Sequence, residues 1–252
     1  MLWEGEQSIT DLINVTFPNL DSHIGDKNYM RDRAILTPLN EHVNMLNDIT
    51  VVQLPGQEVI YYSYDSVSDD ASNFYQPEFL NTLTPCNLPP HKLKLKVGAP
   101  IMLLRNIDPK FGLCNGTRLM CRRFAKNVIE AEILTRHFEG NSVFLPRIPL
   151  NTAEDIKLPF QLTRKQFPVR LSFGLTINKS QGQTFQHVGI YLPNNVFSHG
   201  QLYVALSRGT SRDKTNVLVQ NGKIDNHTGI YTANVVYKEI FAQLQHQHRI
   251  SH

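Results

Sequence analysis

A chain of 252 residues with 41% hydrophobic residues can bury the core of one large domain, or of a medium domain that carries an insertion. Its apolar runs are shorter than the ~18 residues of a membrane helix, and residues 1–15 lack the basic and apolar segments of a signal peptide. We therefore expect no membrane contact and no secretion. Cys86, Cys114 and Cys121 form no C-x-x-C pair, which argues for a reducing compartment and against a disulfide framework or a cysteine zinc site.

The net charge of +3 is unevenly distributed along the chain. Residues 1–78 hold 13 acidic and 3 basic residues, a balance of −10, whereas residues 79–252 hold 9 and 22, a balance of +13. No acidic residue lies between Asp155 and Asp213, and the basic residues of this window are Lys157, Arg164, Lys165, Arg170, Lys179, Arg208 and Arg212. Such a stretch attracts polyphosphate. The alternative is a solvated surface that happens to be basic.

The first elements along the chain have the pattern of an α/β protein. Ile9, Leu12 and Ile13 have helical spacing. The short apolar run at residues 34–36 predicts a buried strand, which Pro38 ends. An amphipathic helix follows, with the apolar stripe Leu39, Val43, Leu46 and Ile49.

Residues 91–106 begin with strict alternation of polar and apolar residues. Lys92, Lys94 and Lys96 alternate with Leu93, Leu95 and Val97, which predicts a half-buried strand with three lysines on one face. Two interpretations stay open at this point. The lysines could follow a nucleic-acid backbone, or they could protect an edge strand from aggregation.

Short strand-like runs separated by turn residues fill the middle of the chain. They lie at residues 119–121, 128–134 and 143–145, and Asn115-Gly116 is a strong turn signal. This spacing is typical of a small β-barrel or meander. We therefore interpret residues 113–167 as an all-β insertion.

The αβ pattern returns after Arg170. It predicts strands at residues 171–175, 187–192 and 216–219, a helix over 195–208, and a final helix with Val236, Ile240 and Leu244 on one side. The histidines of the tail have no acidic or cysteine neighbours, so we expect no metal site.

The polar loop from Thr176 to Thr184 has the chemistry of a phosphate-binding turn. Thr176 and Ser180 offer hydroxyl groups, Lys179 offers a point charge, and Gly182 lets backbone N–H groups approach an oxygen. Arg208 follows on a short helical stretch and suits the charge of a phosphoryl transition state. The alternatives are an ordinary βα turn and an arginine that only complements a helix dipole.

Five segments together resemble the petite-integration-frequency (Pif) family of DNA helicases, including the helicase portion of Helitron transposons. They are Arg33–Asn40, Leu95–Asn106, Asn115–Arg118, Thr176–Thr184 and Tyr203–Arg208, and the resemblance covers about residues 5–220. It implies an α/β fold: a second RecA-like motor domain, with a mostly parallel sheet and flanking helices, interrupted by a small SH3-like β-barrel. The expected divisions are 1–112 and 168–235 for the motor domain, 113–167 for the barrel, and 236–252 for a terminal helix and tail.

The resemblance also implies roles for the two polar segments. Arg208 becomes the catalytic arginine finger of an ATP-dependent 5′-to-3′ DNA helicase, and Gly182 and Gln183 lie with it near the nucleotide. Thr176, Asn178, Lys179 and Ser180 lie near single-stranded DNA. Many family members have histidine where this chain has Asn178, so a base-stacking role is not carried over to that position.

The P-loop pattern G-x-x-x-x-G-K-[ST] does not occur in these 252 residues. ATP and Mg²⁺ are therefore expected to bind only in a complete two-domain enzyme, with a first RecA-like domain as partner in cis, and this chain alone is not expected to hydrolyse ATP. We expect a monomer in the nucleus, or alternatively in mitochondria, with a role in DNA repair, recombination and telomere maintenance. Two alternatives remain: a non-catalytic module that binds single-stranded nucleic acid, and a degenerate transposon remnant.

Overall fold

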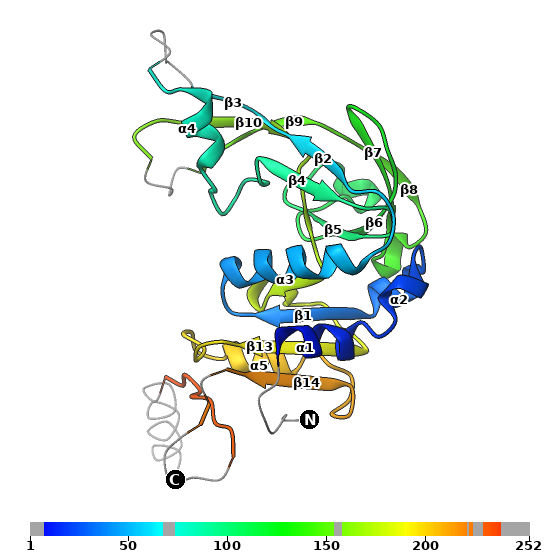
Figure 1. Ribbon diagram of the computed structural model, residues 1–252, viewed down its shortest axis with the longest axis vertical. Coiled ribbons are helices and arrows are strands. Elements are labelled where there is room, and N and C mark those ends of the chain that lie inside the picture. Colours follow the sequence, from blue (N-terminus) through cyan, green and yellow to red (C-terminus); the bar gives the residue numbers. More distant parts are fainter. Residues whose placement is uncertain (1–7, 68–73, 154–157, 221, 224–228, 238–252) are drawn as a thin grey trace, which may run out of the picture.

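A four-stranded parallel sheet forms the base of the molecule (Figure 1). The structure is a computed structural model that describes residues 8–67, 74–153, 158–220, 222–223 and 229–237. The strand order is β12 (Gly174–Thr176), β1 (Arg33–Thr37), β13 (His187–Leu192) and β14 (Thr215–Val219), all parallel. This sheet confirms the α/β class and the parallel core.

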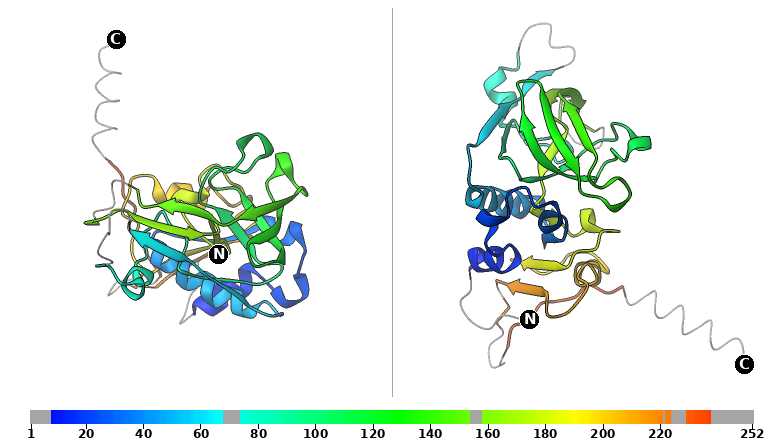
Figure 2. Two further views of the ribbon diagram at one scale, coloured as in Figure 1. Left: turned by 90° about the horizontal axis from the view of Figure 1, so that it is seen from above. Right: turned by 90° about the vertical axis from the view of Figure 1, so that its right-hand side faces the viewer.

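Helices cover both faces of the parallel sheet, as the right-hand view of Figure 2 shows. On one face lie α1 (Ile9–Thr16) and α3 (Asn40–Gln53), and on the other lies α5 (Gln201–Leu206). Ile35 of β1 packs with Leu12 and Leu46 in one core cluster, whereas Leu36 packs with Ala205 in another. Successive residues of a strand point to opposite faces, so a continuous apolar run suits a strand that is covered on both sides.

Helix α1 lies directly against the sheet. Ser8 begins the helix with a capping box, in which Ser8 and Asp11 bond to one another's backbone N–H groups. A Cβ atom added to Gly189 of β13 would lie 2.6 Å from the Thr16 hydroxyl oxygen. The glycine therefore permits the close approach of helix and strand.

The upper part of the molecule is built from antiparallel strands. The largest sheet has the order β11 (Val169–Leu171), β5 (Pro100–Leu103), β6 (Arg118–Phe124), β7 (Val128–Ile133) and β8 (Ser142–Pro146). Strands β5 and β11 lie outside residues 113–167, so this sheet extends beyond the predicted insertion on both sides.

Two smaller antiparallel sheets complete the upper part. β2 (Val59–Tyr62) pairs with β4 (Lys92–Leu95), and β3 (Tyr64–Val67) pairs with β10 (Leu162–Gln166), which also pairs with β9 (Ile148–Asn151). The remaining helices are α2 (Lys27–Arg31), α4 (Pro77–Thr82) and the 3-10 turns Leu20–His23, Pro109–Phe111, Arg136–Phe138 and Asn178–Ser180. Among these described helices, none has the length and hydropathy that crossing a bilayer requires.

Two predicted elements differ from the structure, and a third lies mostly outside the described residues. The apolar run 171–175 belongs to two sheets, because β11 ends at Leu171 and β12 begins at Gly174. The helix predicted over 195–208 spans only Gln201–Leu206. The predicted final helix lies mostly outside the described residues, since only 236 and 237 of it are described, and these are neither helix nor strand.

Lys96 does not join the predicted lysine face. Lys92 and Lys94 are exposed, but Lys96 is buried, and its ammonium group donates to the carbonyl oxygens of Val52 (3.2 Å) and Leu54 (2.5 Å) at the end of α3. A cation at this position satisfies carbonyl groups that a helix end leaves unpaired. The alternation therefore stops at Leu95, and Lys96 ties the upper strands to helix α3.

Candidate functional site

The carboxyl ends of β1 and β12 meet at one edge of the parallel sheet. Thr37 pairs with Thr176 in the strand register, and the Ile177 N–H donates to the Thr37 carbonyl oxygen over 3.0 Å. The Thr37 side chain is fully buried, and its hydroxyl oxygen has no hydrogen-bond partner. Helix α3 starts three residues later without a side-chain cap. The N–H groups of an uncapped helix start can bind a phosphate group.

The predicted DNA-binding residues occupy a tight turn at this edge. The Lys179 N–H donates to the Thr176 hydroxyl oxygen over 3.3 Å, while Asn178 and Lys179 are exposed. Ser180 is fully buried, and its hydroxyl donates to the Ile177 carbonyl oxygen over 2.7 Å. Thr176, Asn178 and Lys179 therefore face the outside together, whereas Ser180 stabilises the turn from within.

Gly182 and Gln183 lie beside a cavity of about 310 Å³ between the parallel sheet and the connection of β7 to β8. Arg31, Asp32 and Arg118 also line it. Gly182 has a φ of +81° and open space where a Cβ atom would be, a backbone conformation that glycine adopts without strain. Arg31 forms an ion pair with Asp32 at 2.8 Å, so the lining of the cavity carries charges of both signs.

Arg208 is folded against this loop. Its Nη1 donates to the Gln183 carbonyl oxygen (2.9 Å), its Nε to the Val204 carbonyl oxygen (3.0 Å), and its Nη2 to the Ser207 hydroxyl (2.9 Å). These bonds use three of the five N–H groups of a guanidinium. The Arg208 carbonyl oxygen in turn accepts from the Phe185 N–H. The two polar segments that the sequence singles out thus form one unit.

Arg118 is a functional candidate that the sequence indicated only as the last residue of the segment Asn115–Arg118. It is buried, and burial lowers the pKa of its guanidinium to about 10. It donates to a set of backbone carbonyl oxygens at 3.0–3.2 Å, those of Met30, Arg31, Arg33 and Ser172. Its guanidinium also lies 5.2 Å from the centre of the Phe185 ring. The side chain therefore joins the antiparallel sheet to the loop that carries Gly182; its place in the N-G-T-R segment was the available signal.

The acid-free window is not one continuous basic surface. Arg164 is fully buried in an ion pair with Asp65, and Arg170 donates to the carbonyl oxygens of Cys86 and Leu88. Among the described residues, neither Lys179 nor Arg208 forms an ion pair. The positive charges of Arg164 and Arg170 thus serve contacts within the fold. The charges of Lys179 and Arg208 are not neutralised by an ion pair among the described residues and can act on a ligand. The described residues contain no group of three metal-binding side chains.

Known proteins resemble this chain in sequence. The family model "DNA helicase Pif1, 2B domain" matches residues 78–124, which start well before residue 113. The chain is 33% identical over 202 residues to the ATP-dependent DNA helicase PIF1 of Danio rerio, and 30% identical over 206 residues to that of Homo sapiens. Each match covers 75% of this chain and 28% of the relative, so the chain spans less than a third of these proteins.

Solved structures share the fold. Bacteroides Pif1 helicase in complex with ADP-AlF3 and ssDNA matches with a TM-score of 0.61 and 21% identity, over 96% of this chain and 50% of that one. Bacteroides Pif1 bound to ssDNA matches with a TM-score of 0.59 and 22% identity, over 94% and 53%. The family model, the relatives and the shared fold together identify the chain as a region of a Pif1-family DNA helicase.

Proposed function

We propose that the chain is the second motor region of an ATP-dependent 5′-to-3′ DNA helicase, which supplies an arginine finger and contacts to single-stranded DNA. The observation that carries the proposal is the bond from the Arg208 guanidinium to the Gln183 carbonyl oxygen. It couples the predicted finger to the loop that would approach the nucleotide. A shift of one of these groups would therefore move the other.

Single-stranded DNA would bind at the carboxyl edge of the parallel sheet. Thr176, Asn178 and Lys179 present a hydroxyl, an amide and a cation there, and Thr37 lies beside them. The relative solved in complex with ssDNA supports this choice of ligand. Neutralising phosphates with lysine makes such binding sensitive to salt.

ATP and Mg²⁺ would bind only when a domain with a P-loop stands opposite this site. Gly182 and Gln183 would approach the phosphates, and the guanidinium of Arg208 would stabilise the negative charge that develops on the transferring phosphoryl group. The residues present fit the part of such a site that contacts the phosphates, because they supply hydrogen-bond donors and a cation. Among the described residues, no cluster of carboxylates could hold the metal. Hydrolysis by this chain alone is not expected.

The test is steady-state ATP hydrolysis, stimulated by single-stranded DNA, in a helicase assembled from this chain and a first motor domain. Arg208→Ala should lower kcat by about 10³-fold or more, and Arg208→Lys should restore little, because a lysine lacks the planar fork. Ser207→Ala is the matched control, since it removes one of the bonds to the guanidinium but keeps the charge. Unchanged turnover in Arg208→Ala would remove the finger assignment.

A non-catalytic module that binds single-stranded nucleic acid is the second candidate, favoured by the exposed Lys179 beside Thr176. It predicts the same DNA binding but no hydrolysis in any assembly. A transposon remnant without activity predicts neither.

Our proposal also includes an SH3-like barrel around residues 113–167, a monomer, and a role in DNA repair, recombination and telomere maintenance in the nucleus or in mitochondria. Light scattering tests whether the chain is a monomer, and imaging of the tagged protein tests its location in the cell.

A further inference from the structure

The extended chain from β2 into β3 exposes every second side chain. Ile60 is 40% exposed, Tyr62 51% and Tyr64 69%, whereas Tyr61 and Ser63 between them are buried. Exposed aromatic rings in a row are costly to leave in water and are typical of binding surfaces.

A lysine stands opposite each of these exposed apolar side chains. The register pairs Ile60 with Lys94 and Tyr62 with Lys92 across β2 and β4, and Tyr64 with Lys165 across β3 and β10. All three lysines are exposed. Directly paired residues share one face of a sheet. We call these six residues the lysine–aromatic ladder.

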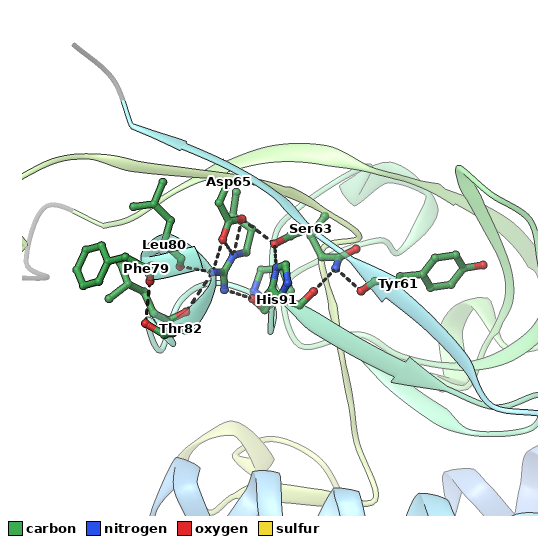
Figure 3. A network of polar contacts seen from close by, with 11 residues as sticks. Tyr61, Ser63, Asp65, Phe79, Leu80, Thr82 and His91 are labelled. Atoms are coloured by element: carbon green, nitrogen blue, oxygen red, sulfur yellow. Dashed lines mark hydrogen bonds and ion pairs between the residues drawn. The ribbon is translucent and has the colours of Figure 1, made fainter. Parts of the chain in front are cut away.

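A network of polar contacts holds the buried side of the same strands (Figure 3). Asp65 forms an ion pair with Arg164, and both side chains are fully buried. The Ser63 hydroxyl bonds to Asp65 (2.7 Å) and to Nδ1 of His91 (2.8 Å). The tyrosines therefore project from a strand that need not be ordered when a ligand binds, and preorganisation lowers the cost of binding.

The ladder continues toward the proposed DNA site. Lys92 and Lys94 line a cavity of about 320 Å³ together with Asn44 of α3 and Arg170. Helix α3 begins close to Thr37, at the edge of the parallel sheet where Lys179 stands. Asp48 lines the same cavity, and its carboxylate disfavours an anion deep inside. Contacts to phosphate would therefore come from the exposed lysine ends.

We propose that the lysine–aromatic ladder is a second binding surface for single-stranded DNA, on which bases stack on Tyr62 and Tyr64 while the lysines contact the phosphates. Lysines beside aromatic rings are the chemistry with which proteins hold single strands without reading their sequence. The inference rests on the proposed function in taking single-stranded DNA as ligand. The opposing interpretation is that Lys92 and Lys94 only protect an exposed edge from aggregation.

The experiment measures the affinity of the whole 252-residue chain for fluorescein-labelled oligothymidylate by anisotropy, at low salt and without nucleotide. Tyr62→Ala and Tyr64→Ala should each raise Kd by about fivefold or more, whereas Tyr62→Phe should retain the affinity because stacking needs the ring and not the hydroxyl. Lys92→Ala and Lys165→Ala should each reduce the slope of log K against log salt by about 0.7. The matched controls are Phe144→Ala, since Phe144 is 66% exposed on β8, and Lys110→Ala.

Each outcome decides one question. If the unaltered chain does not bind, the proposed function fails and the ladder with it. If Lys179→Ala weakens binding but the tyrosine and lysine variants of the ladder do not, only the ladder is refuted. Equal losses in Tyr62→Ala and Phe144→Ala would also refute it. If Lys92→Ala with Lys94→Ala aggregates but binds normally, the lysines protect the edge instead. Because Tyr62 and Tyr64 are surface residues, their removal should leave the thermal midpoint nearly unchanged.

Discussion

The ion pair of Arg164 and Asp65 should be among the most sensitive points of the upper strands. Its Nη2–Oδ2 distance is 2.6 Å and its Nε–Oδ1 distance 2.9 Å, and both side chains are fully buried. Arg164 also donates to the carbonyl oxygens of Leu80, Leu83 and Pro89. One side chain thus joins β3, β10, α4 and the segment before β4. Asp65→Asn keeps the shape but leaves the guanidinium without a counter-charge.

The expected cost is large relative to the stability of a domain. Leaving one member of a buried pair uncompensated costs about 3–5 kcal/mol, against a total of about 5–15 kcal/mol for a folded protein. The free energy of unfolding falls by about 1–3 kcal/mol for each M of urea, so the urea concentration at the unfolding midpoint should fall by about 1 M or more. Far-UV circular dichroism reports this midpoint.

Two comparisons isolate the effect of the buried charge. Glu130→Gln breaks the pair with Arg123, whose side chain is 80% exposed, and should leave the midpoint nearly unchanged. Asp65→Leu combined with Arg164→Met removes both charges and should recover much of the loss. An Asp65→Asn midpoint that matches that of Glu130→Gln would refute the reasoning.

Three further outcomes follow from the packing and charge of other residues. Lys96→Met keeps the buried stem but removes two charged hydrogen bonds at the end of α3, so thermal unfolding should show a loss of about 1–3 kcal/mol. Gly189→Ala brings a methyl group against Thr16 and should destabilise the fold by about 1–3 kcal/mol, read in the same assay. Burial lowers the pKa of His91 below the 6.5 of the unfolded chain; the Asp65 carboxylate opposes this shift, and the cations Arg164 and Lys92 add to it. Below pH 6.5 the unfolded state therefore binds a proton at His91 more readily than the folded state does. The contribution of neutral His91 to the free energy of unfolding is present above pH 6.5 and is lost as the pH falls. Melting temperatures between pH 7.5 and 5.5 should decline less steeply in His91→Gln.

Continuous apolar runs made the parallel core predictable. Strands β1 and β13 are buried on both faces, so their sequences contain few polar residues and their positions could be predicted directly. The run at 171–175 has the same composition, yet it passes from one sheet to another at Ser172 and Phe173. The hydrophobicity of a segment does not reveal which neighbouring strand it pairs with.

The candidate site could be proposed from the sequence where its chemistry is local. The loop 176–184 and Arg208 could be singled out from residue types, and the structure joins them through Gln183. The roles of Arg118 and Arg164 could not, because their partners are remote: Asp65 lies 99 residues from Arg164 along the chain. A buried arginine and a surface arginine look the same in a sequence until the fold brings the partner to one of them.

Binding of single-stranded DNA by the intact chain tests the central claim most directly. Anisotropy with an unlabelled duplex as competitor should show preference for the single strand, weakening as salt rises, with Lys179→Ala reducing the affinity and no ATP hydrolysed. Two results would contradict the assignment of the carboxyl edge as a DNA site. One is the absence of binding at low salt, and the other is an affinity that stays the same in the double variant Lys179→Ala with Thr176→Val.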